Sequence, residues 1–419
     1  MRARKQESGK AGKKKTGADA ALFAFFILLL LLPALVNAKV YIDITSPAAR
    51  KLPLSINITG PAAAKMIEWV VKSDLEATGL FSFADPGVPG AEMIADIEVT
   101  LSDKTLKTIL SVNDLIEGRE VLKKSYSASE TGTRAVGHSI SNDLYEAATG
   151  RKGIFRTKLS CLSATAPGEK ELRLMDWDGY NSFRVPSKGM TASHAWSRDG
   201  RMLIFSSDQD RKWKIYTLDL TQYSRTVLFS SNGLNLVGDA SSDGLVAFSS
   251  SRDGNSEIYT MDISGGDLKK ITRSFGIDVS PVFSPDNKKI AFVSDRGGTP
   301  QIYTVDADGN GLKRVTFEGT YNTSPAWSPD GKWIAYVGRV DGKNQIFMVK
   351  SDNSGTRQLT NSGNNENPVF SPDGFFIAFD SDMAGKRGIY IMRSNGEDRR
   401  RITPEYMDAT KPKWSPYLK

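Results

Sequence analysis

A short motif that recurs at a nearly constant interval constrains the fold of this chain more than any other feature. In each copy, a serine precedes a turn sequence such as Pro-Asp-Gly, and successive copies are 43 or 44 residues apart. An interval of this size and regularity is typical of an array built from one repeated supersecondary unit. The serines are Ser197, Ser241, Ser284, Ser328, Ser371 and Ser415.

Each interval contains the same series of short β-branched and aromatic runs. In one interval they are Ile334–Gly338, Gln345–Val349 and Arg357–Thr360, and Gly, Asp, Asn and Ser separate them. Such runs read as strands joined by turns. Together with the run that ends at each serine, they predict four strands per repeat, which we name A to D in chain order. A four-stranded unit of about 40–45 residues is typical of a β-propeller blade.

The two ends of the repeat region predict how the ring closes. Residues 154–186 supply strands B, C and D of a first blade but no strand A. The C-terminal run Lys411–Ser415 supplies a strand A with no strands after it. We therefore predict six blades, with the last strand completing the first blade. Closure of this kind leaves only short strand edges exposed.

The motif itself reads as a turn rather than as part of an active site. Ser328-Pro329-Asp330-Gly331 has the residues that a type I turn prefers at its first, second and fourth positions. A catalytic aspartate would be expected once, whereas this aspartate recurs in five blades. Asp176–Gly179 and Asp306–Gly309 resemble calcium loops but lack the later glutamate, so we expect turns between strands C and D. The sequence leaves open whether a cation lies in the central channel.

Residues 1–38 have the pattern of a signal peptide. A basic segment, Met1–Lys15, precedes the apolar run Ala21–Ala38, which ends at small residues that suit cleavage before Lys39. The alternative is a retained membrane anchor, because the uncharged run Ala20–Val36 has the roughly 17 residues of a short span. Seven basic and two acidic residues lie within residues 1–38, which accounts for five of the seven net positive charges of the chain. The remainder is nearly neutral, so we expect no nucleic-acid partner.

Residues 39–150 have a different pattern of apolar residues from the repeats, and this pattern predicts a small α/β domain. Helices are expected where apolar residues recur every three or four positions, and strands where they alternate. Met66 and Trp69 are expected to pack in its core. Cys161, the single cysteine, is expected to be buried, with a reactive thiol as the minor alternative. The expected elements are helices at Ala62–Gly79 and Thr133–Thr149 and strands at Lys39–Ile44, Met93–Leu101, Thr105–Val112 and Glu120–Ala128.

The predicted domains are therefore a signal peptide at 1–38, an α/β domain at 39–150 and a six-bladed β-propeller at 151–419. The two histidines, His138 and His194, have no metal-ligand spacing. The chain has no Gly-x-Ser-x-Gly elbow, phosphate loop or dinucleotide fingerprint. We therefore expect no enzyme, no cofactor and no metal ligands. The alternative is a propeller lyase or glycosidase that uses channel carboxylates on envelope polysaccharide.

Several stretches carry a resemblance to a known family. Besides the repeat SPDGKWIAYVG, they are KVYIDITSPAARKLPLSI from Lys39, SDLEATGLFSF from Ser73, HSISNDLYEAATGRKGIFRTKLSCLS from His138 and the ending KPKWSPYLK. With these stretches the chain resembles the TolB family, the periplasmic components of the Tol-Pal system, over essentially all of residues 39–419. The second-blade repeat DASSDG departs from the pattern, because it lacks the proline and the aromatic residue.

The resemblance implies a periplasmic binding scaffold. Its expected partners are Pal, the peptidoglycan-associated lipoprotein, at the propeller mouth and the inner-membrane protein TolA at the N-terminal region. Other outer-membrane lipoproteins are further expected partners. The implied role is support of outer-membrane integrity and of envelope constriction at cell division. No membrane span is expected after cleavage of the signal peptide.

The resemblance also places the binding residues. We expect Pal to bind the connections between strands D and A, which share one face of a propeller, with His194 and Tyr321 as anchors. The TolA-binding switch segment is expected at Lys39, Val40, Tyr41, Ile42, Asp43 and Ile44. The residues expected at the Pal site are His194, Phe275, Asp278, Tyr321, Asn322, Thr323, Asn365, Glu366, Asp408 and Thr410.

Overall fold

The computed structural model describes residues 50–166, 168–187 and 189–418. The predicted signal peptide and the predicted strand Lys39–Ile44 lie outside this part of the chain. Within it, no helix combines the length and the apolar character that crossing a membrane requires.

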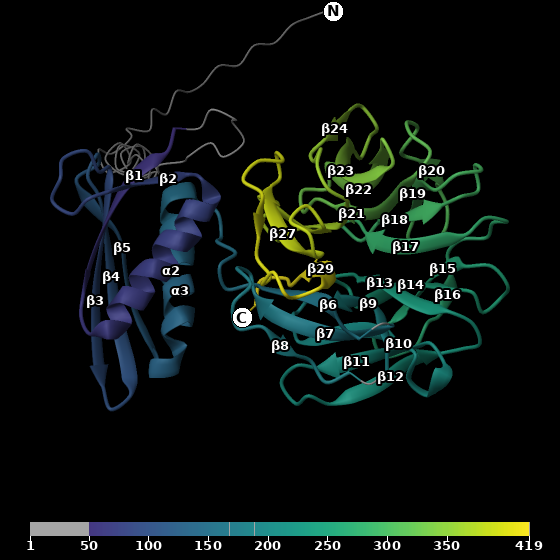
Figure 1. Ribbon diagram of the computed structural model, residues 1–419, viewed down its shortest axis with the longest axis horizontal. Coiled ribbons are helices and arrows are strands. Elements are labelled where there is room, and N and C mark those ends of the chain that lie inside the picture. The colour runs from purple at the N-terminus through teal and green to yellow at the C-terminus, as the bar shows by residue number, and fades with distance from the viewer. Residues whose placement is uncertain (1–49, 167, 188, 419) are drawn as a thin grey trace, which may run out of the picture. The chain divides into compact units, whose positions relative to one another are not determined.

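From residue 50 onward, where the structure describes the chain, the α/β domain is a five-stranded sheet with two long helices (Figure 1). Strand β1 lies between β2 and β3 and pairs parallel with both, whereas β3, β4 and β5 follow one another antiparallel. The elements are β1 Leu52–Thr59, α2 Ala62–Thr78, β2 Phe81–Ala84, β3 Met93–Ser102, β4 Thr105–Asp114, β5 Arg119–Ser129, η1 Glu130–Gly132 and α3 Thr133–Thr149. The structure confirms both predicted helices and the three predicted strands β3, β4 and β5. Strands β1 and β2 were missed.

Both helices end at a glycine. Gly79 and Gly150 have φ of +68° and +69°, in the left-handed region that glycine adopts without steric cost. Their N–H groups donate to Glu76 O at 2.9 Å and Glu146 O at 2.8 Å, which satisfies carbonyls of the last turns.

The prediction that Met66 and Trp69 pack in the core is wrong, since 45% and 44% of their surfaces are exposed. The buried residues of α2 include Asp74 but not Met66, so the buried side of the helix differs from the predicted one. Trp69 packs on the surface of the domain, with its ring centroid 5.5 Å from that of Tyr180 and 5.3 Å from the Arg134 guanidinium.

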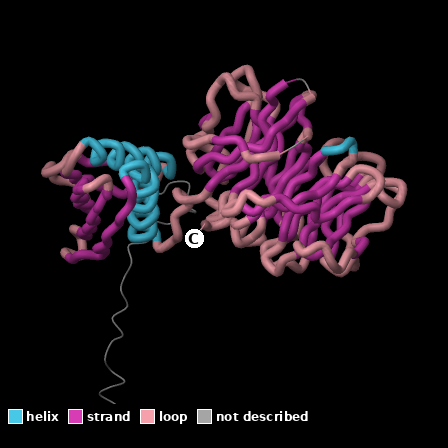
Figure 2. Tube along the Cα trace, turned by 90° about the horizontal axis from the view of Figure 1, so that it is seen from below, coloured by secondary structure: helices cyan, strands magenta, loops and turns pink. Residues whose placement is uncertain are grey.

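Six four-stranded antiparallel sheets follow and form the propeller (Figures 1 and 2). The first sheet has the order β29-β6-β7-β8, which confirms that the C-terminal strand closes the ring. The strands of this sheet are β29 Ala409–Trp414, β6 Lys158–Ala166, β7 Glu169–Asp176 and β8 Phe183–Arg184.

The other five blades run in chain order, A to D. They are β9 Thr191–Trp196, β10 Met202–Ser207, β11 Lys214–Asp219 and β12 Arg225–Ser230, with η2 Gln209–Arg211; β13 Asn235–Ala240, β14 Leu245–Ser250, β15 Glu257–Asp262 and β16 Lys269–Lys270; β17 Asp278–Phe283, β18 Lys289–Ser294, β19 Gln301–Asp306 and β20 Lys313–Arg314; β21 Asn322–Trp327, β22 Trp333–Val340, β23 Lys343–Lys350 and β24 Thr356–Gln358; and β25 Asn365–Phe370, β26 Phe376–Ser381, β27 Gly388–Arg393 and β28 Arg400–Arg401.

The recurring motif forms the turn between strands A and B. The N–H of Gly331, with φ +71°, donates to Ser328 O at 2.9 Å. The Ser328 hydroxyl donates to Asp330 Oδ1 at 2.5 Å and accepts from the N–H of Trp333 at 2.9 Å. Asp330 Oδ1 also accepts from the N–H of Lys332 at 3.0 Å. The carboxylate is thus used to hold the turn, as the recurrence predicted.

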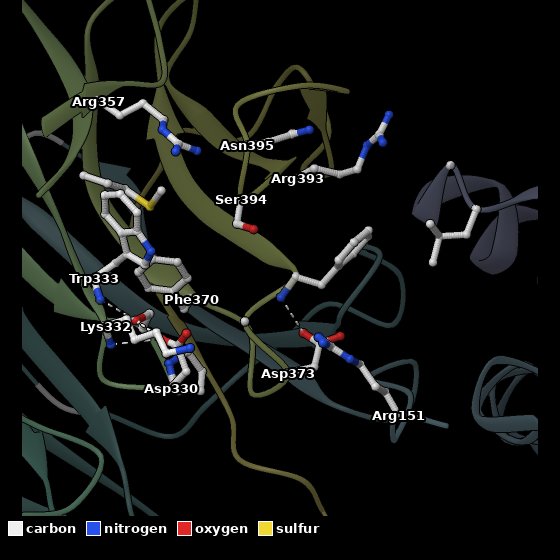
Figure 3. Close-up of a pocket in the computed structure, with 17 residues that line it drawn as sticks. Arg151, Asp330, Lys332, Trp333, Arg357, Phe370, Asp373, Arg393, Ser394 and Asn395 are labelled. Carbon is white, nitrogen blue, oxygen red and sulfur yellow. Dashed lines mark hydrogen bonds between the residues drawn. The ribbon is translucent and has the colours of Figure 1, made fainter. Parts of the chain in front are cut away.

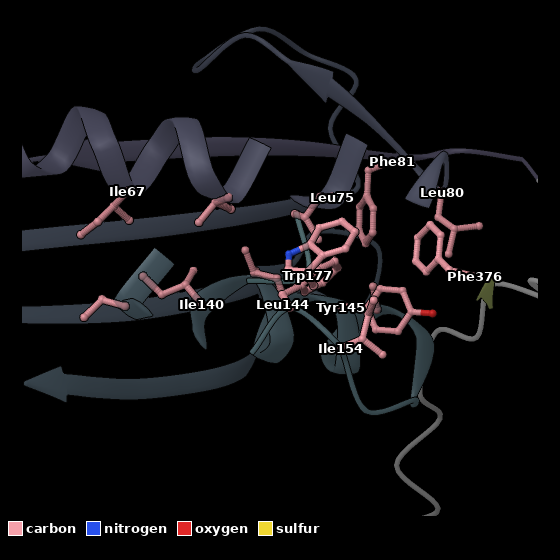
Figure 4. Close-up of a cluster of buried hydrophobic side chains, with 14 of the residues drawn as sticks. Ile67, Leu75, Leu80, Phe81, Ile140, Leu144, Tyr145, Ile154, Trp177 and Phe376 are labelled. Carbon is pink, nitrogen blue, oxygen red and sulfur yellow. The ribbon is translucent and has the colours of Figure 1, made fainter. Parts of the chain in front are cut away.

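A continuous apolar core joins the α/β domain to the propeller (Figure 4). Trp177, which follows β7, is fully buried, and its ring centroid lies 5.3 Å from Phe155 and 5.9 Å from Phe376. Ile67 and Leu144 of the helices belong to the same cluster. The residues that join the two domains come from the A–B and C–D turns, so the α/β domain contacts the propeller on the face opposite the D–A connections.

Cys161 is buried in β6, as predicted. Burial raises the pKa of its thiol to about 12, which keeps it protonated and unreactive at neutral pH.

Candidate functional site

Exposed apolar side chains gather in the D–A connections of the propeller. Phe275 is fully exposed and Tyr406 is 78% exposed, although both are large aromatic residues. Ile277 lies two residues after Phe275, and Leu234 and Phe317 occupy the corresponding connections of other blades. Because D–A connections share one face of a propeller, these five residues lie on the same face, and we name them the apolar rim. Exposed apolar groups of this kind mark surfaces for association.

Three of the ten predicted Pal-site residues lie in D–A connections, namely Phe275, Tyr321 and Asp408. Tyr321 is half-buried, and the guanidinium of Arg339 lies 4.1 Å from its ring centroid. This cation–π contact fixes the ring at the mouth.

Two predicted asparagines are instead buried at the start of the innermost strands. Asn322 Nδ2 donates to Gln301 Oε1 and to Glu318 O, each at 2.8 Å. Asn365 Nδ2 donates to Gln345 Oε1 at 3.0 Å in the same arrangement one blade later. Each bond joins strand A of one blade to strand C of the preceding blade, so these amides hold blades together.

Asp278 and His194 are also buried rather than exposed at the mouth. Asp278 begins β17, and its Oδ2 lies 2.6 Å from Arg296 Nη2. Burial raises the pKa of the Asp278 carboxyl, against the opposing effect of Ser294 and Arg296. His194 lies within β9, deep in the channel wall. The expectation that these two residues lie on mouth loops is therefore wrong.

The remaining three, Thr323, Glu366 and Thr410, are half-buried in innermost strands. Glu366 Oε1 accepts from Asn344 Nδ2 at 2.9 Å, and its Oε2 lies 3.5 Å from Arg387 Nη1. The predicted segment Lys39–Ile44 lies outside the described residues.

Sequence reasoning missed Leu234, Phe317 and Tyr406. Each stands between strand D of one blade and strand A of the next, as Phe275, Tyr321 and Asp408 do. The available signal was a large apolar residue in a connection otherwise rich in Gly, Asn and Glu.

The face opposite the rim contains a cavity of about 540 Å³ (Figure 3). Its lining combines Gly79 and Leu80 with A–B and C–D turn residues, among them Asp330, Asp373 and Arg393. The turn aspartates in this cavity have structural partners: Asp373 Oδ1 accepts from the Ser371 hydroxyl and from the N–H of Phe375 at 3.0 Å.

A buried polar cluster joins the helices to the first blade. Asp74, His138 and Asp178 each place one potential ligand atom within 4.8 Å of the others, a separation at which a metal ion could be held. Their ligand atoms already have partners in the chain: His138 Nδ1 is 2.7 Å from Asp74 Oδ2, and Arg134 Nη2 is 2.6 Å from Asp178 Oδ2. The Arg134 guanidinium already supplies a positive charge to Asp178, so the cluster reads as a structural hydrogen-bond network rather than as a metal site.

The fold and this site define the class: a six-bladed β-propeller protein with an N-terminal α/β domain and an apolar rim at one propeller mouth. A family model described as the TolB beta propeller domain matches residues 145–418. The chain belongs to this TolB propeller family.

Named relatives agree with the family. The chain is 33% identical over 231 residues to the Tol-Pal system protein TolB of Dechloromonas aromatica, which covers 50% of this chain and 54% of the relative. It is 30% identical over 290 residues to that of Bordetella parapertussis, covering 63% and 66%. The chain thus spans about half to two thirds of the length of these curated relatives. The crystal structure of TolB from Acinetobacter baumannii superposes with a TM-score of 0.78 at 26% identity, covering 88% of this chain and 97% of that chain.

Proposed function

We propose that the chain is a periplasmic binding scaffold of a Tol-Pal system, directed by a signal peptide at residues 1–38. In this proposal, the rim face of the propeller, residues 151–419, binds the peptidoglycan-associated lipoprotein Pal. The N-terminal region, beginning with Lys39–Ile44, binds TolA. The complex supports outer-membrane integrity and envelope constriction at division.

The observation that carries the proposal is the apolar rim. Phe275 and Tyr406 expose large aromatic surfaces that contribute nothing to the core. Aromatic side chains of this kind are enriched among the residues that dominate binding energy at protein interfaces. The α/β domain contacts the opposite face, so within the described residues it leaves the rim accessible.

The alternative, an enzyme with channel carboxylates, has less support. Within the described residues, two cavities are lined by all six innermost strands: the smaller has two lysines and no carboxylate, and the larger has a single carboxylate, that of Asp239. A glycosidase would need a pair of carboxyl groups there, about 5–9 Å apart. We therefore propose a non-enzymatic role.

The test is binding to the purified lipoprotein of the same organism. We expect the double variant Phe275→Ala/Tyr406→Ala to bind at least about tenfold more weakly, because truncation of aromatic anchors commonly costs 2 kcal/mol or more. The matched control is Tyr223→Ala, since Tyr223 is 51% exposed but lies in a C–D connection on the opposite face. Equal affinity of the double variant and the control would contradict the rim assignment, and no binding by the unmodified protein would contradict the partner.

The proposed role of Lys39–Ile44 has a separate test. Deletion of these six residues should change the affinity for the lipoprotein, because a switch segment must make different contacts in the two states. The midpoint of propeller unfolding should stay nearly unchanged. An unaltered affinity would reject the switch.

A further inference from the structure

A small cavity lies on the axis of the propeller, where all six innermost strands meet. Its volume is about 90 Å³, and strands β9, β13, β17, β21, β25 and β29 each contribute lining residues. In four of these strands the lining includes a residue with positive φ followed by proline: Ser280, Ser324, Asn367 and Lys411, with φ between 52° and 57°. The strand pairing is irregular at each of these positions, so a bulge places them against the cavity.

Departures from the repeat identify the residues with specific chemistry. Four prolines, Pro281, Pro325, Pro368 and Pro412, occupy equivalent positions around the cavity. The blade that begins with β9 has His194 in place of this proline. Only the last strand places lysines in the lining, Lys411 and Lys413. A position that recurs in every blade serves the fold, whereas these three residues occur once and require another explanation.

The titratable side chains that line the cavity are basic, although burial lowers the pKa of both lysines. Both charged residues of the lining are lysines, and no carboxylate lines it. The nearest acidic neighbour of Lys411 is compensated elsewhere, because Asp380 Oδ2 lies 2.6 Å from Arg387 Nη1 and its Oδ1 accepts from Asn367 Nδ2 at 2.8 Å. Burial lowers the pKa of Lys413, and Asp239 opposes this effect. Asp239 does not line this cavity, but it lines the adjoining channel cavity together with Lys413.

Each lysine ammonium group donates fewer hydrogen bonds to the described residues than it can make. Lys411 Nζ donates to Ala192 O at 2.9 Å, and Lys413 Nζ donates to Gly238 O at 3.3 Å. These are the hydrogen bonds that the described residues provide to the two ammonium groups. An ammonium has three N–H groups, so two remain on each lysine for another acceptor.

Strand β9, which neighbours the lysine strand β29, contributes Ser193 and His194 to the wall of the cavity. His194 is 1% exposed, and within the described residues neither ring nitrogen meets a hydrogen-bond partner at acceptable geometry. The backbone of Ser160 is nonetheless close enough to act as a hydrogen-bond partner that raises the pKa of the ring. Burial and the nearby lysines lower the pKa of His194 to about 3, so the ring is neutral and has a single N–H. The Ser193 hydroxyl beside it is likewise without a partner in the described chain.

We propose that this cavity binds one small oxyanion of the phosphate or sulfate class, with Lys411 and Lys413 as charged contacts and Ser193 as a further donor. An oxyanion satisfies buried donors that otherwise carry a desolvation cost, and charge-assisted hydrogen bonds to it are the strong kind. A cation, which the sequence left open, would face two positive charges here. The site does not depend on the proposed binding of the lipoprotein.

The test is calorimetric titration of the purified protein with inorganic phosphate, at constant ionic strength set by sodium chloride. We expect saturable binding, weakened at least about tenfold in Lys411→Met and in Lys413→Met, because each removes a charged donor. The control is Lys107→Met, since Lys107 is an exposed residue of β4. Sulfate should compete with phosphate, and chloride should not. Heats that depend on ionic strength alone, or equal phosphate affinity in the lysine variants and the control, would overturn the proposal.

A second measurement needs no variant. The chain has two histidines, so nitrogen NMR of the imidazole rings resolves few signals. Phosphate should shift the ring signals of His194 and leave those of His138 unchanged. Unchanged His194 signals at saturating phosphate would overturn the assignment even if the lysine variants fail to fold.

Discussion

His138 Nδ1 lies 2.7 Å from Asp74 Oδ2, and this buried pair joins α3 to α2 directly beside the propeller. Trp177 Nε1 donates to the other oxygen of Asp74 at 3.2 Å. Asp178 lies on the far side of the ring, with its Oδ2 3.9 Å from His138 Nε2 and bonded to Arg134. One imidazole therefore connects groups from both domains.

This arrangement predicts a pH dependence of stability. Burial lowers the pKa of His138, but Asp74 and Asp178 raise it by more, despite the opposing charge of Arg134, so the folded pKa lies above its ordinary value. The stabilisation that protonated His138 gives to the folded state is therefore fully present below about pH 6.5, the pKa of histidine in the unfolded chain. It is lost as pH rises through the folded pKa of His138. We expect the free energy of unfolding to fall as pH rises above about 6.5 and through the folded pKa. Urea unfolding at several pH values should show this fall in the unmodified protein and a flatter profile in His138→Gln. Parallel profiles would contradict the assignment.

Trp177 predicts a large loss of stability on truncation. Its ring is fully buried against Phe155 and Phe376, and its N–H satisfies Asp74. We expect Trp177→Ala to cost about 3–5 kcal/mol in urea unfolding, since it leaves a cavity and removes a hydrogen bond from a buried carboxylate. Trp333→Ala is the control, because Trp333 is half-exposed and should cost less. Equal costs would mean that Trp177 does not couple the domains.

The sequence predicted the fold better than the site, for one physical reason. A repeated position reports what every blade needs, and this logic correctly assigned Asp330 to a turn. The same logic applies to Asn322, because Asn365 and Asp278 stand at the equivalent position. Its recurrence indicated a role in joining blades, not in recognition. Strand β1 was missed because its partners β2 and β3 are distant in sequence, and its pattern of Ser55 and Asn57 among apolar residues is weak by itself.

Asn322 supports a prediction that separates stability from binding. Removal of its amide leaves Gln301 Oε1 with one fewer donor in a buried site, where the Thr316 hydroxyl still donates at 2.8 Å. We expect Asn322→Ala to lower the free energy of unfolding by about 1–3 kcal/mol. Lipoprotein affinity should change less than threefold under conditions in which the variant is folded. A large loss of affinity without a loss of stability would return Asn322 to the binding surface.

The turn between β21 and β22 predicts a smaller, local effect. Gly331 has φ +71°, and the nearest atom to an added Cβ would be Pro285 Cδ at 3.9 Å, so space is available but the backbone conformation is unfavourable for alanine. We expect Gly331→Ala to cost about 1–2 kcal/mol. Gly355→Ala is the control, since Gly355 also has open space but no positive φ. Thermal unfolding of the two variants should separate these cases, and equal midpoints would contradict the strain argument.

The closing strand predicts how the propeller depends on its C-terminus. In β29, the Trp414 ring N–H donates to the Thr157 hydroxyl at 2.8 Å, and the adjacent Ser415 hydroxyl accepts from the N–H of Lys158 at 2.9 Å. Both contacts join residues more than 250 positions apart, so they form only when the ring closes. We expect Trp414→Ala to cost about 3–5 kcal/mol, because Trp414 is 93% buried.

Deletion of residues 409–418 should have a stronger effect, because β6 would then present an unpaired edge that favours aggregation. Light scattering and urea unfolding would measure both effects. A monomeric deletion variant with an unchanged unfolding midpoint would mean that the other five blades hold the ring without closure.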